Sequence, residues 1–310
     1  MPTRREILKF AALLAAPPET RLLLGGDVML ARIVGHTARE KRDPALPFRD
    51  LAPVMSAADI AFLNLESLFC DQGKPSEAGM VFKAEPEMIA GLKAAGIDVV
   101  STANNHARDR GGYGIEYNLR WLAQNGILAA GTGETAAKAH EGVTLVRRGV
   151  RFGFLAYAQD QTNGNYKDHD DRICDMEIPQ LQRDIAAMKA RADVIVVSMH
   201  AGLEYWTKVH PIQTKFAKAA IDAGAKVVAG HHPHVVQPWE RYGGGVIFYS
   251  LGNLVFDQYD RKQTREGLLA EVVFSGTEIR DIRTLPVEME SGITRLRKSP
   301  LDSEASPSRP

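Results

Sequence analysis

The chain has 310 residues, 45% of them apolar and 25% charged, so it can bury a sizeable core as one large domain or two smaller ones. Its 38 lysines and arginines equal its 38 aspartates and glutamates, which argues against a nucleic-acid partner and against a surface steered to anionic lipid. Cys70 and Cys174 are the only cysteines. This count excludes a disulfide framework and a thiolate zinc site, and leaves one bridge possible.

The first residues have the pattern of a targeting segment. Two arginines in TRREILKF (3–10) precede the apolar stretch FAALLAA (10–16), which resembles a twin-arginine export signal. In such a signal the cationic part stays on the cytoplasmic side while the apolar part enters the membrane. We therefore predict an export signal or N-terminal anchor over residues 1–20, and a protein that is periplasmic or anchored facing outward. An amphipathic N-terminal helix is the alternative.

Short apolar runs alternate with helical patterns from Arg21 onward, and several runs are unbroken, as expected for strands covered on both faces. Two helices are predicted over 86–95 and 211–223, each opened by proline and followed by glycine. The segments 267–275 and 277–290 are expected to close the chain as an antiparallel pair. This repetition predicts an α/β architecture in a single domain over residues 21–297, followed by a disordered tail over 298–310.

Polar side chains cluster at the carboxyl ends of these apolar runs. In α/β sheets this is the edge at which ligands bind. Alone, each residue is better explained as a turn, a helix cap or a satisfied core residue, but six such runs together indicate a site. Imidazole, carboxylate and amide oxygen suit zinc, manganese or iron. The residues concerned are Asp27, Asn64, Glu66, Asn104, Asn105, His106, His200, His231, His232, His234 and Asn253.

Six ordered motifs carry a family resemblance. GGDVML, NLES, ANNHARDRGG, HAGLEYW, GHHPHVVQP and SLGNLVFDQ lie within roughly residues 22–258 and resemble CapA-type proteins of poly-γ-glutamate and capsule biosynthesis. That family is similar to the calcineurin-like metallophosphatases. The resemblance implies a four-layer α/β/β/α sandwich with two mixed sheets. The alternation of strands and helices alone would equally allow a plain doubly wound sheet.

The resemblance also implies a ligand set. One metal position would be held by Glu66, Asn105, His200 and His232, and a second by Asp27, Glu66 and His234, with His231 left as an extra. At the second position Met29 stands where a histidine is expected, and a thioether is a poor ligand for such ions. We therefore expect one divalent Mn, Zn or Fe ion, with a second ion weak or absent.

Three functions are compatible with these residues. In a metal-assisted hydrolase or transferase acting on an anionic or amide-containing envelope substrate, His106 with Asp109 would supply acid catalysis. In a metal-free enzyme acting on a peptide-like or glutamyl substrate, His200 and His234 would move protons together with Glu66 and Asp27. In a non-catalytic component for binding or export of an anionic polymer, a local anion pocket would include the basic residues Lys83, Arg108 and Arg110.

Candidate substrate-binding residues come from the same motifs. Glu204 and Tyr205 follow His200, although Tyr205 and Trp206 could equally cover apolar surface as a lid. Asn64 and Asn253 are further candidates, and Asn253 is also a plausible turn residue beside Gly252. Membrane-bound components of capsule synthesis are possible partners. The identity of the substrate cannot be read from the sequence, because a fold does not fix a reaction.

Overall fold

Two mixed β-sheets packed face to face form the centre of the molecule, in a computed structural model that describes residues 18–73, 79–160 and 169–297. The predicted export segment up to residue 17 and the tail 298–310 lie outside the described residues. Glu19 and Thr20 already belong to the first strand, which therefore overlaps the last two residues of the segment predicted over 1–20.

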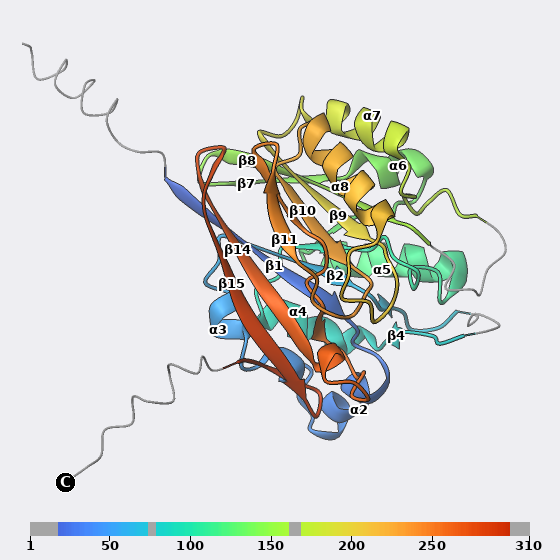
Figure 1. Ribbon diagram of the computed structural model, residues 1–310. Helices are drawn as coiled ribbons and strands as arrows, with labels where there is room; N and C mark the ends of the chain where they lie inside the picture. Colours follow the sequence, from blue (N-terminus) through green and yellow to red (C-terminus); the bar gives the residue numbers. More distant parts are fainter. Residues whose placement is uncertain (1–17, 74–78, 161–168, 298–310) are drawn as a thin grey trace, which may run out of the picture.

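The first sheet has eight strands in the order β16-β15-β14-β1-β2-β5-β6, with β13 beside β1 (Figure 1). β1 pairs in parallel with β2 and antiparallel with β14, so the sheet is mixed. The expected closing pair is confirmed as the antiparallel strands β14 and β15. The strands are β1 (Glu19–Val28), β2 (Ile60–Leu65), β5 (Val99–Ser101), β6 (Leu128–Ala130), β13 (Asn253–Val255), β14 (Glu266–Ser275), β15 (Glu278–Glu290) and β16 (Ile293–Leu296).

The second sheet has six strands in the order β11-β12-β10-β9-β8-β7. β8, β9, β10 and β12 run parallel, and the antiparallel edge strands β7 and β11 make this sheet mixed as well. Its strands are β7 (Val143–Arg147), β8 (Val150–Ala158), β9 (Val194–His200), β10 (Val227–His231), β11 (Trp239–Tyr242) and β12 (Gly245–Phe248). A separate pair is formed by β3 (Leu68–Phe69) and β4 (Lys83–Ala84).

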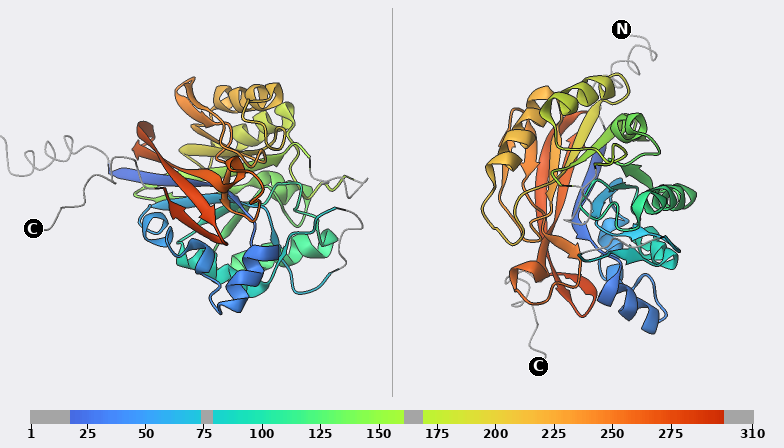
Figure 2. Two further views of the ribbon diagram at one scale, coloured as in Figure 1. Left: turned by 60° about the horizontal axis from the view of Figure 1, so that its bottom comes forward. Right: turned by 90° about the vertical axis from the view of Figure 1, so that its right-hand side faces the viewer.

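Helices cover the outer faces of both sheets, as the right-hand view of Figure 2 shows. On the first sheet lie α2 (Arg32–Glu40), η1 (Leu46–Phe48), α3 (Ala52–Met55), η2 (Pro86–Met88), α4 (Ile89–Ala94) and α5 (Gly111–Gln124); on the second lie α6 (Ala136–Glu141), α7 (Ile178–Met188) and α8 (Pro211–Ala223); η3 (Gln263–Arg265) precedes β14. The predicted helix over 211–223 is confirmed as α8, which ends at Gly224 with a φ of 118°. The segment predicted as a helix over 86–95 is a 3-10 turn that continues into α4.

Three apolar layers confirm the four-layer sandwich. Side chains alternate along β1, so Leu23 packs toward the helices of its own sheet while Leu22 and Leu24 pack between the sheets. Phe62 and Phe154 stack across that inner layer with ring centroids 5.7 Å apart. The third layer joins the second sheet to α7 and α8. A plain doubly wound sheet is thereby ruled out.

Two glycines let β1 approach the segment before β13. A Cβ at Gly26 would lie 1.9 Å from the carbonyl oxygen of Gly252, so only glycine fits there. The same approach lets the N–H of Asp27 donate to that oxygen at 2.9 Å. The register between β1 and β2 shifts between Leu24 and Asp27. As a result, Asp27 stands opposite both Asn64 and Asn253, which places the end of β1 at the site described below.

Two further features concern the cysteines and the helices. Cys70 and Cys174 are both buried free thiols, so the possible bridge is not formed. Among the helices of the described ranges, none has the length and apolar character needed to cross a bilayer.

Candidate functional site

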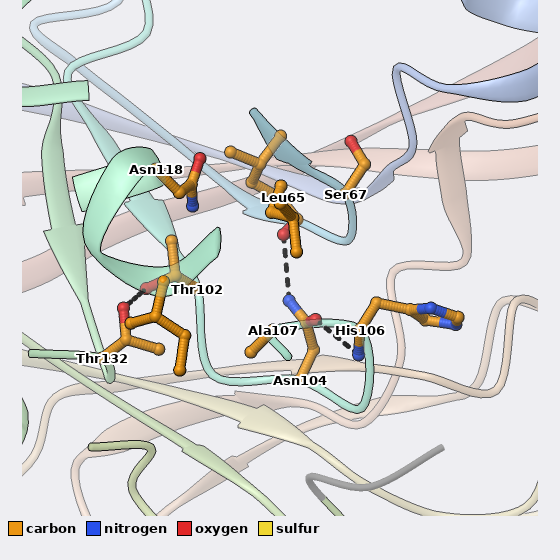
Figure 3. Close-up of a pocket in the computed structure, with 10 residues that line it drawn as sticks. Leu65, Ser67, Thr102, Asn104, His106, Ala107, Asn118 and Thr132 are labelled. Carbon is orange, nitrogen blue, oxygen red and sulfur yellow. Dashed lines mark hydrogen bonds between the residues drawn. The ribbon is translucent and has the colours of Figure 1, made fainter. Parts of the chain in front are cut away.

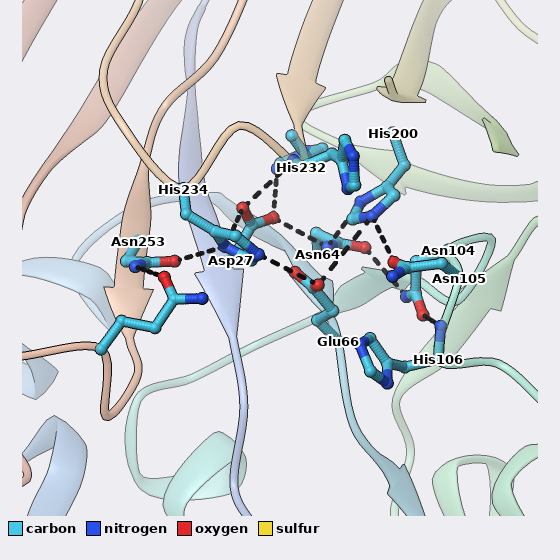
Figure 4. A network of polar contacts seen from close by, with 12 residues as sticks. Asp27, Asn64, Glu66, Asn104, Asn105, His106, His200, His232, His234 and Asn253 are labelled. Atoms are coloured by element: carbon cyan, nitrogen blue, oxygen red, sulfur yellow. Dashed lines mark hydrogen bonds and ion pairs between the residues drawn. The ribbon is translucent and has the colours of Figure 1, made fainter. Parts of the chain in front are cut away.

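The carboxyl ends of five strands from both sheets bring the predicted polar residues together (Figure 4). β1 supplies Asp27, and β2 supplies Asn64 with Glu66 directly after it. The segment after β5 carries Asn104, Asn105 and His106. The second sheet contributes His200 from the end of β9 and the histidines 231, 232 and 234 from the end of β10 and the residues after it. The expectation that residues far apart in the sequence share one edge is met.

Asp27 is a hub of this cluster and is fully buried. Its Oδ1 accepts a hydrogen bond from Asn64 Nδ2 at 2.8 Å and lies 3.4 Å from His231 Nδ1. Its Oδ2 accepts from the main-chain N–H of His232 at 3.2 Å and lies 3.5 Å from His234 Nδ1. The carboxylate is therefore held by donors from both sheets.

Glu66 differs from Asp27 because neither of its buried side-chain oxygens has a hydrogen-bond partner among the described residues. Oε1 lies 3.6 Å from His234 Nε2 and 3.9 Å from His200 Nε2, beyond hydrogen-bonding distance. Keeping an ionised carboxylate buried without partners costs several kcal/mol of desolvation free energy. Ligand atoms of Asp27, Glu66 and His200 lie within 4.8 Å of one another, which is the spacing that a shared cation would satisfy. The donor set fits a divalent metal ion.

Candidate ligands of both expected metal positions surround Glu66, and the three whose ligand atoms lie within 4.8 Å of one another, Asp27, Glu66 and His200, come from both positions. On one side His200 Nε2 contacts Asn105 Oδ1 at 2.9 Å, and the His200 ring centroid lies 4.8 Å from that of His232, whose Nδ1 has no hydrogen-bond partner. On the other side are Asp27 and His234. Met29 belongs to the apolar layer under the helices, where its sulfur accepts the N–H of Ala31 at 3.2 Å. Met29 therefore does not join Asp27 and His234, and the number of metal ions stays a prediction.

Burial and mutual charge shift the pKa values of these groups in different directions. Burial opposes ionisation of Asp27, but the close imidazoles of His231 and His234 hold the pKa of its carboxyl well below the usual value. Burial raises the pKa of Glu66 well above its ordinary value and lowers that of His200 well below. Burial, followed by the charge on His234, lowers the pKa of His232 to about 4. Burial would also lower the pKa of His234, but Glu66 and Asp27 raise it to about 9.

His106 forms a pair with Asp109, as the sequence suggested. Its Nδ1 contacts Asp109 Oδ2 at 2.7 Å, and both side chains are nearly fully buried. Asp109 Oδ2 also accepts the N–H of Phe82 at 2.6 Å, and the Phe82 ring stacks on His106 with centroids 3.7 Å apart. These contacts fix the orientation of the His106 ring.

A small cavity of about 10 Å³ lies behind His106 (Figure 3). Thr102 and Thr132 contact each other there at 2.6 Å, and Asn104 accepts the N–H of His106 at 3.0 Å. A polar cavity of this size holds about one water molecule. The polar residues that line it hydrogen-bond to one another and to the main chain of His106, which holds the segment after β5 in place.

Asn64 and Asn253, predicted as substrate ligands, are fully buried and bonded to other members of the cluster. Asn64 joins Asp27 to the Nδ1 of His200, 3.3 Å away, and accepts a hydrogen bond from Asn104 at 3.2 Å. Asn253 Oδ1 contacts His234 Nδ1 at 2.9 Å, and the residue opens β13 rather than forming a turn. These contacts orient the candidate ligands, and contact with substrate stays a prediction for both residues.

Glu204 and Tyr205 lie at the rim. Glu204 is exposed, and Tyr205 is half-buried with its ring centroid 6.3 Å from that of His234. Burial, then the charge of Glu204, raises the pKa of Tyr205 to about 12. The residues Lys83, Arg108 and Arg110 have partners within the chain: Glu85, Asp170 and the carbonyl oxygen of Gly73, respectively.

Sequence reasoning missed several residues around this cluster. Asn104 was noted without a role, yet its side chain joins Asn64 to the carbonyl oxygen of Leu65 at 2.9 Å. Phe82 gave no signal in the sequence because nothing distinguishes it from a core residue. Backbone strain was equally invisible: Tyr205, His232 and His234 have φ values of 67°, 94° and 57°. Such conformations concentrate at functional sites.

The chain combines a four-layer fold of two mixed sheets with a buried cluster of candidate metal ligands, and a solved phosphatase has a similar fold. The solved structure of a phosphatase from Mycoplasma pneumoniae matches 87% of this chain and 94% of that one with a TM-score of 0.56. At 12% identity this likeness concerns the fold alone. It agrees with the sandwich architecture described above.

Comparison of sequences identifies the family. The model of the family described as "Bacterial capsule synthesis protein PGA_cap" matches residues 21–258, so the chain belongs to that family. It is 30% identical over 288 residues to the capsule biosynthesis protein CapA of Bacillus anthracis, covering 89% of this chain and 69% of that one. It is 31% identical over 250 residues to the PGA biosynthesis protein CapA of Bacillus subtilis, covering 79% and 65%. The chain thus spans about two thirds of the length of these relatives.

Proposed function

We propose that this protein is a metal-assisted hydrolase or transferase that serves capsule or poly-γ-glutamate biosynthesis and acts on an anionic or amide-containing substrate. The pathway is suggested by the names of the CapA relatives. The chemistry is supported above all by Glu66, because neither of its two buried oxygens has a hydrogen-bond partner among the described residues. The imidazoles and amides around it are groups that bind a divalent cation. Manganese, zinc and iron all fit this donor set.

The residues would divide the work as follows. Glu66, Asn105, His200 and His232 would hold the ion, and a divalent cation supplies Lewis acidity to a water molecule and to the bond that is cleaved. Asn64 fixes the orientations of Asp27 and His200. His106, held at Nδ1 by Asp109, is placed to donate a proton from Nε2 to the leaving group.

Export belongs to the same proposal and is supported by the arginine pair and apolar stretch within residues 3–16. In that location the protein would meet the growing polymer and the membrane-bound components that synthesise it. A signal-peptide fusion to a reporter that is active only outside the cytoplasm tests this part separately.

Elemental analysis of protein prepared without added metal tests the central proposal. We expect about one equivalent of a transition metal in the wild type, a large loss in His232→Ala, and wild-type content in His36→Ala, which changes an exposed histidine on α2. A chelator should abolish turnover, and added Mn²⁺ or Zn²⁺ should restore it. Metal-free wild-type protein with unaltered turnover would contradict the proposal.

A metal-free acid/base enzyme is the second candidate. It is favoured by the raised pKa of His234, about 9, beside the carboxylates of Asp27 and Glu66, because this imidazolium could act as an acid near neutral pH. A bell-shaped pH profile that persists in chelator would select this candidate over the first.

A further inference from the structure

Arg261 and Tyr205 form a stacked pair directly beside the candidate ligands. The guanidinium carbon of Arg261 lies 4.4 Å from the ring centroid of Tyr205, and that ring lies 6.3 Å from the ring of His234. Arg261 is exposed, and within the described ranges it forms no ion pair with a carboxylate. An exposed cation without a partner so close to a buried cluster is available for an anion from outside.

Tyr205 is a fixed platform rather than a mobile side chain. Its main-chain N–H donates to the carbonyl oxygen of Pro233 at 2.8 Å, between the two histidines 232 and 234. Its hydroxyl accepts from Gln258 Nε2 at 3.4 Å, and Gln258 in turn accepts from Asn253 Nδ2 at 3.1 Å. Its backbone is held in the left-handed region, with a φ of 67°. The position of Arg261 is therefore set relative to the cluster.

We propose that Arg261, stacked on Tyr205, binds an acidic group of the substrate, a carboxylate or a phosphate, next to the candidate ligand cluster. A guanidinium presents paired N–H donors that match the two oxygens of such groups, and stacking on an aromatic ring keeps that fork oriented. This assignment rests on the proposed function for the reacting group, which the buried cluster would bind. Arg261 would thereby contribute to the specificity for substrates that carry such an acidic group.

Glu204 provides a test of the assignment, because its negative charge should change anion affinity in the direction opposite to Arg261. Its carboxylate is exposed and its charge raises the pKa of the adjacent Tyr205, so it repels an anion that Arg261 attracts. If Arg261 merely held Tyr205 in place, neutralising either residue would loosen the platform and weaken binding. If Arg261 reads charge, the two substitutions act in opposite directions.

The experiment measures binding of fluorescent probes by anisotropy at two ionic strengths, with metal content determined on the same samples. One probe is a γ-linked glutamate oligomer and the other is inorganic polyphosphate of similar length, so that the arms separate carboxylate from phosphate. For the preferred probe we expect Arg261→Gln to raise Kd about fivefold to tenfold and Arg261→Lys to raise it less. Glu204→Gln should lower Kd about twofold.

Arg120→Gln is the matched control. Arg120 is also an exposed arginine over a tyrosine, 5.4 Å from the ring of Tyr117, but it lies roughly 13 Å along α5 from the start of that helix. It should leave both Kd values unchanged. Equal affinity of wild type and Arg261→Gln, weaker binding by Glu204→Gln, or no binding of either probe to the wild type would overturn the proposal.

Metal content separates this inference from the proposed function. If the wild type contains no metal and Arg261→Gln still binds the probe more weakly than the wild type, the metal-assisted function is refuted and the anion subsite is supported. A wild type that holds metal while Arg261→Gln binds normally would do the reverse.

Discussion

The main-chain N–H of His232 donates to the Oδ2 of Asp27 at 3.2 Å, across a separation of 205 residues. This bond joins the segment after β10 in the second sheet to the end of β1 in the first. A hydrogen bond to a charged carboxylate contributes about 1.5–3 kcal/mol. The candidate site is therefore also a junction between the two sheets, and its residues should affect stability as well as chemistry.

Metal binding to the metal-free protein should release protons. With a pKa of about 9, His234 is protonated at pH 7.5, and Glu66 also has a raised pKa. A divalent cation held by Glu66 opposes the neighbouring imidazolium of His234, whose Nε2 lies 3.6 Å from Glu66 Oε1, so binding should release about one proton at pH 7.5 and fewer as the pH rises through 9. Calorimetry in two buffers with different ionisation enthalpies measures the number. The exposed histidine variant His36→Gln should release as many, whereas identical enthalpies in both buffers would refute the assignment.

Asn64→Ala should weaken the cluster more than its size suggests. The amide is bonded to Asp27 and Asn104, so its loss leaves buried partners unsatisfied and should lower the free energy of unfolding by about 1–3 kcal/mol. Metal affinity should fall about 10–100-fold. Denaturant unfolding and a metal titration check the two effects.

Ser101→Ala is the control for that comparison. Ser101 is also buried at the end of a strand of the same sheet, but its hydroxyl has no hydrogen-bond partner, so the change should be nearly neutral. If both variants lost the same stability, the hydrogen bonds of Asn64 would not be the cause.

Asp109→Ala should lower turnover about 10²-fold while the metal content stays at the wild-type value, because the carboxylate holds His106 and, among the described residues, hydrogen-bonds to none of the candidate ligands. The pair His140 and Asp184, also joined at 2.8 Å, connects α6 to α7 on the outer side of the second sheet. His140→Gln is therefore a matched control and should leave turnover intact. A loss of metal in Asp109→Ala would assign the residue to ion binding instead.

Gly26→Ala should be strongly destabilising. The added methyl group would meet the Gly252 carbonyl oxygen at 1.9 Å and push β1 away from the segment that leads into β13, at a cost of about 3 kcal/mol. Gly126→Ala meets no atom within 4 Å and only strains a positive φ of 76°, which should cost about 1 kcal/mol. Thermal unfolding of the two variants gives the comparison. A smaller loss for Gly26→Ala than for Gly126→Ala would show that the backbone can move apart freely.

The sequence by itself determined the strand order along the chain, the helix α8 and the closing pair of strands, because hydrophobic spacing and the proline and glycine at helix ends are local signals. It also located the candidate ligands from Asp27 to His234, since polar residues directly after unbroken apolar runs must lie at a sheet edge. The family resemblance supplied the division into two sheets, which alternation alone left open.

Only the tertiary structure decided which of these residues orient and which are left without partners. Asn64 and Asn253 hydrogen-bond to candidate ligands, whereas both oxygens of Glu66 lack a hydrogen-bond partner among the described residues. These contacts depend on distances between side chains of two different sheets. The same holds for Arg261, an ordinary surface arginine in the sequence whose ring partner lies 56 positions earlier at Tyr205. Local patterns fix where a strand ends, whereas packing between distant strands fixes what each side chain finally meets.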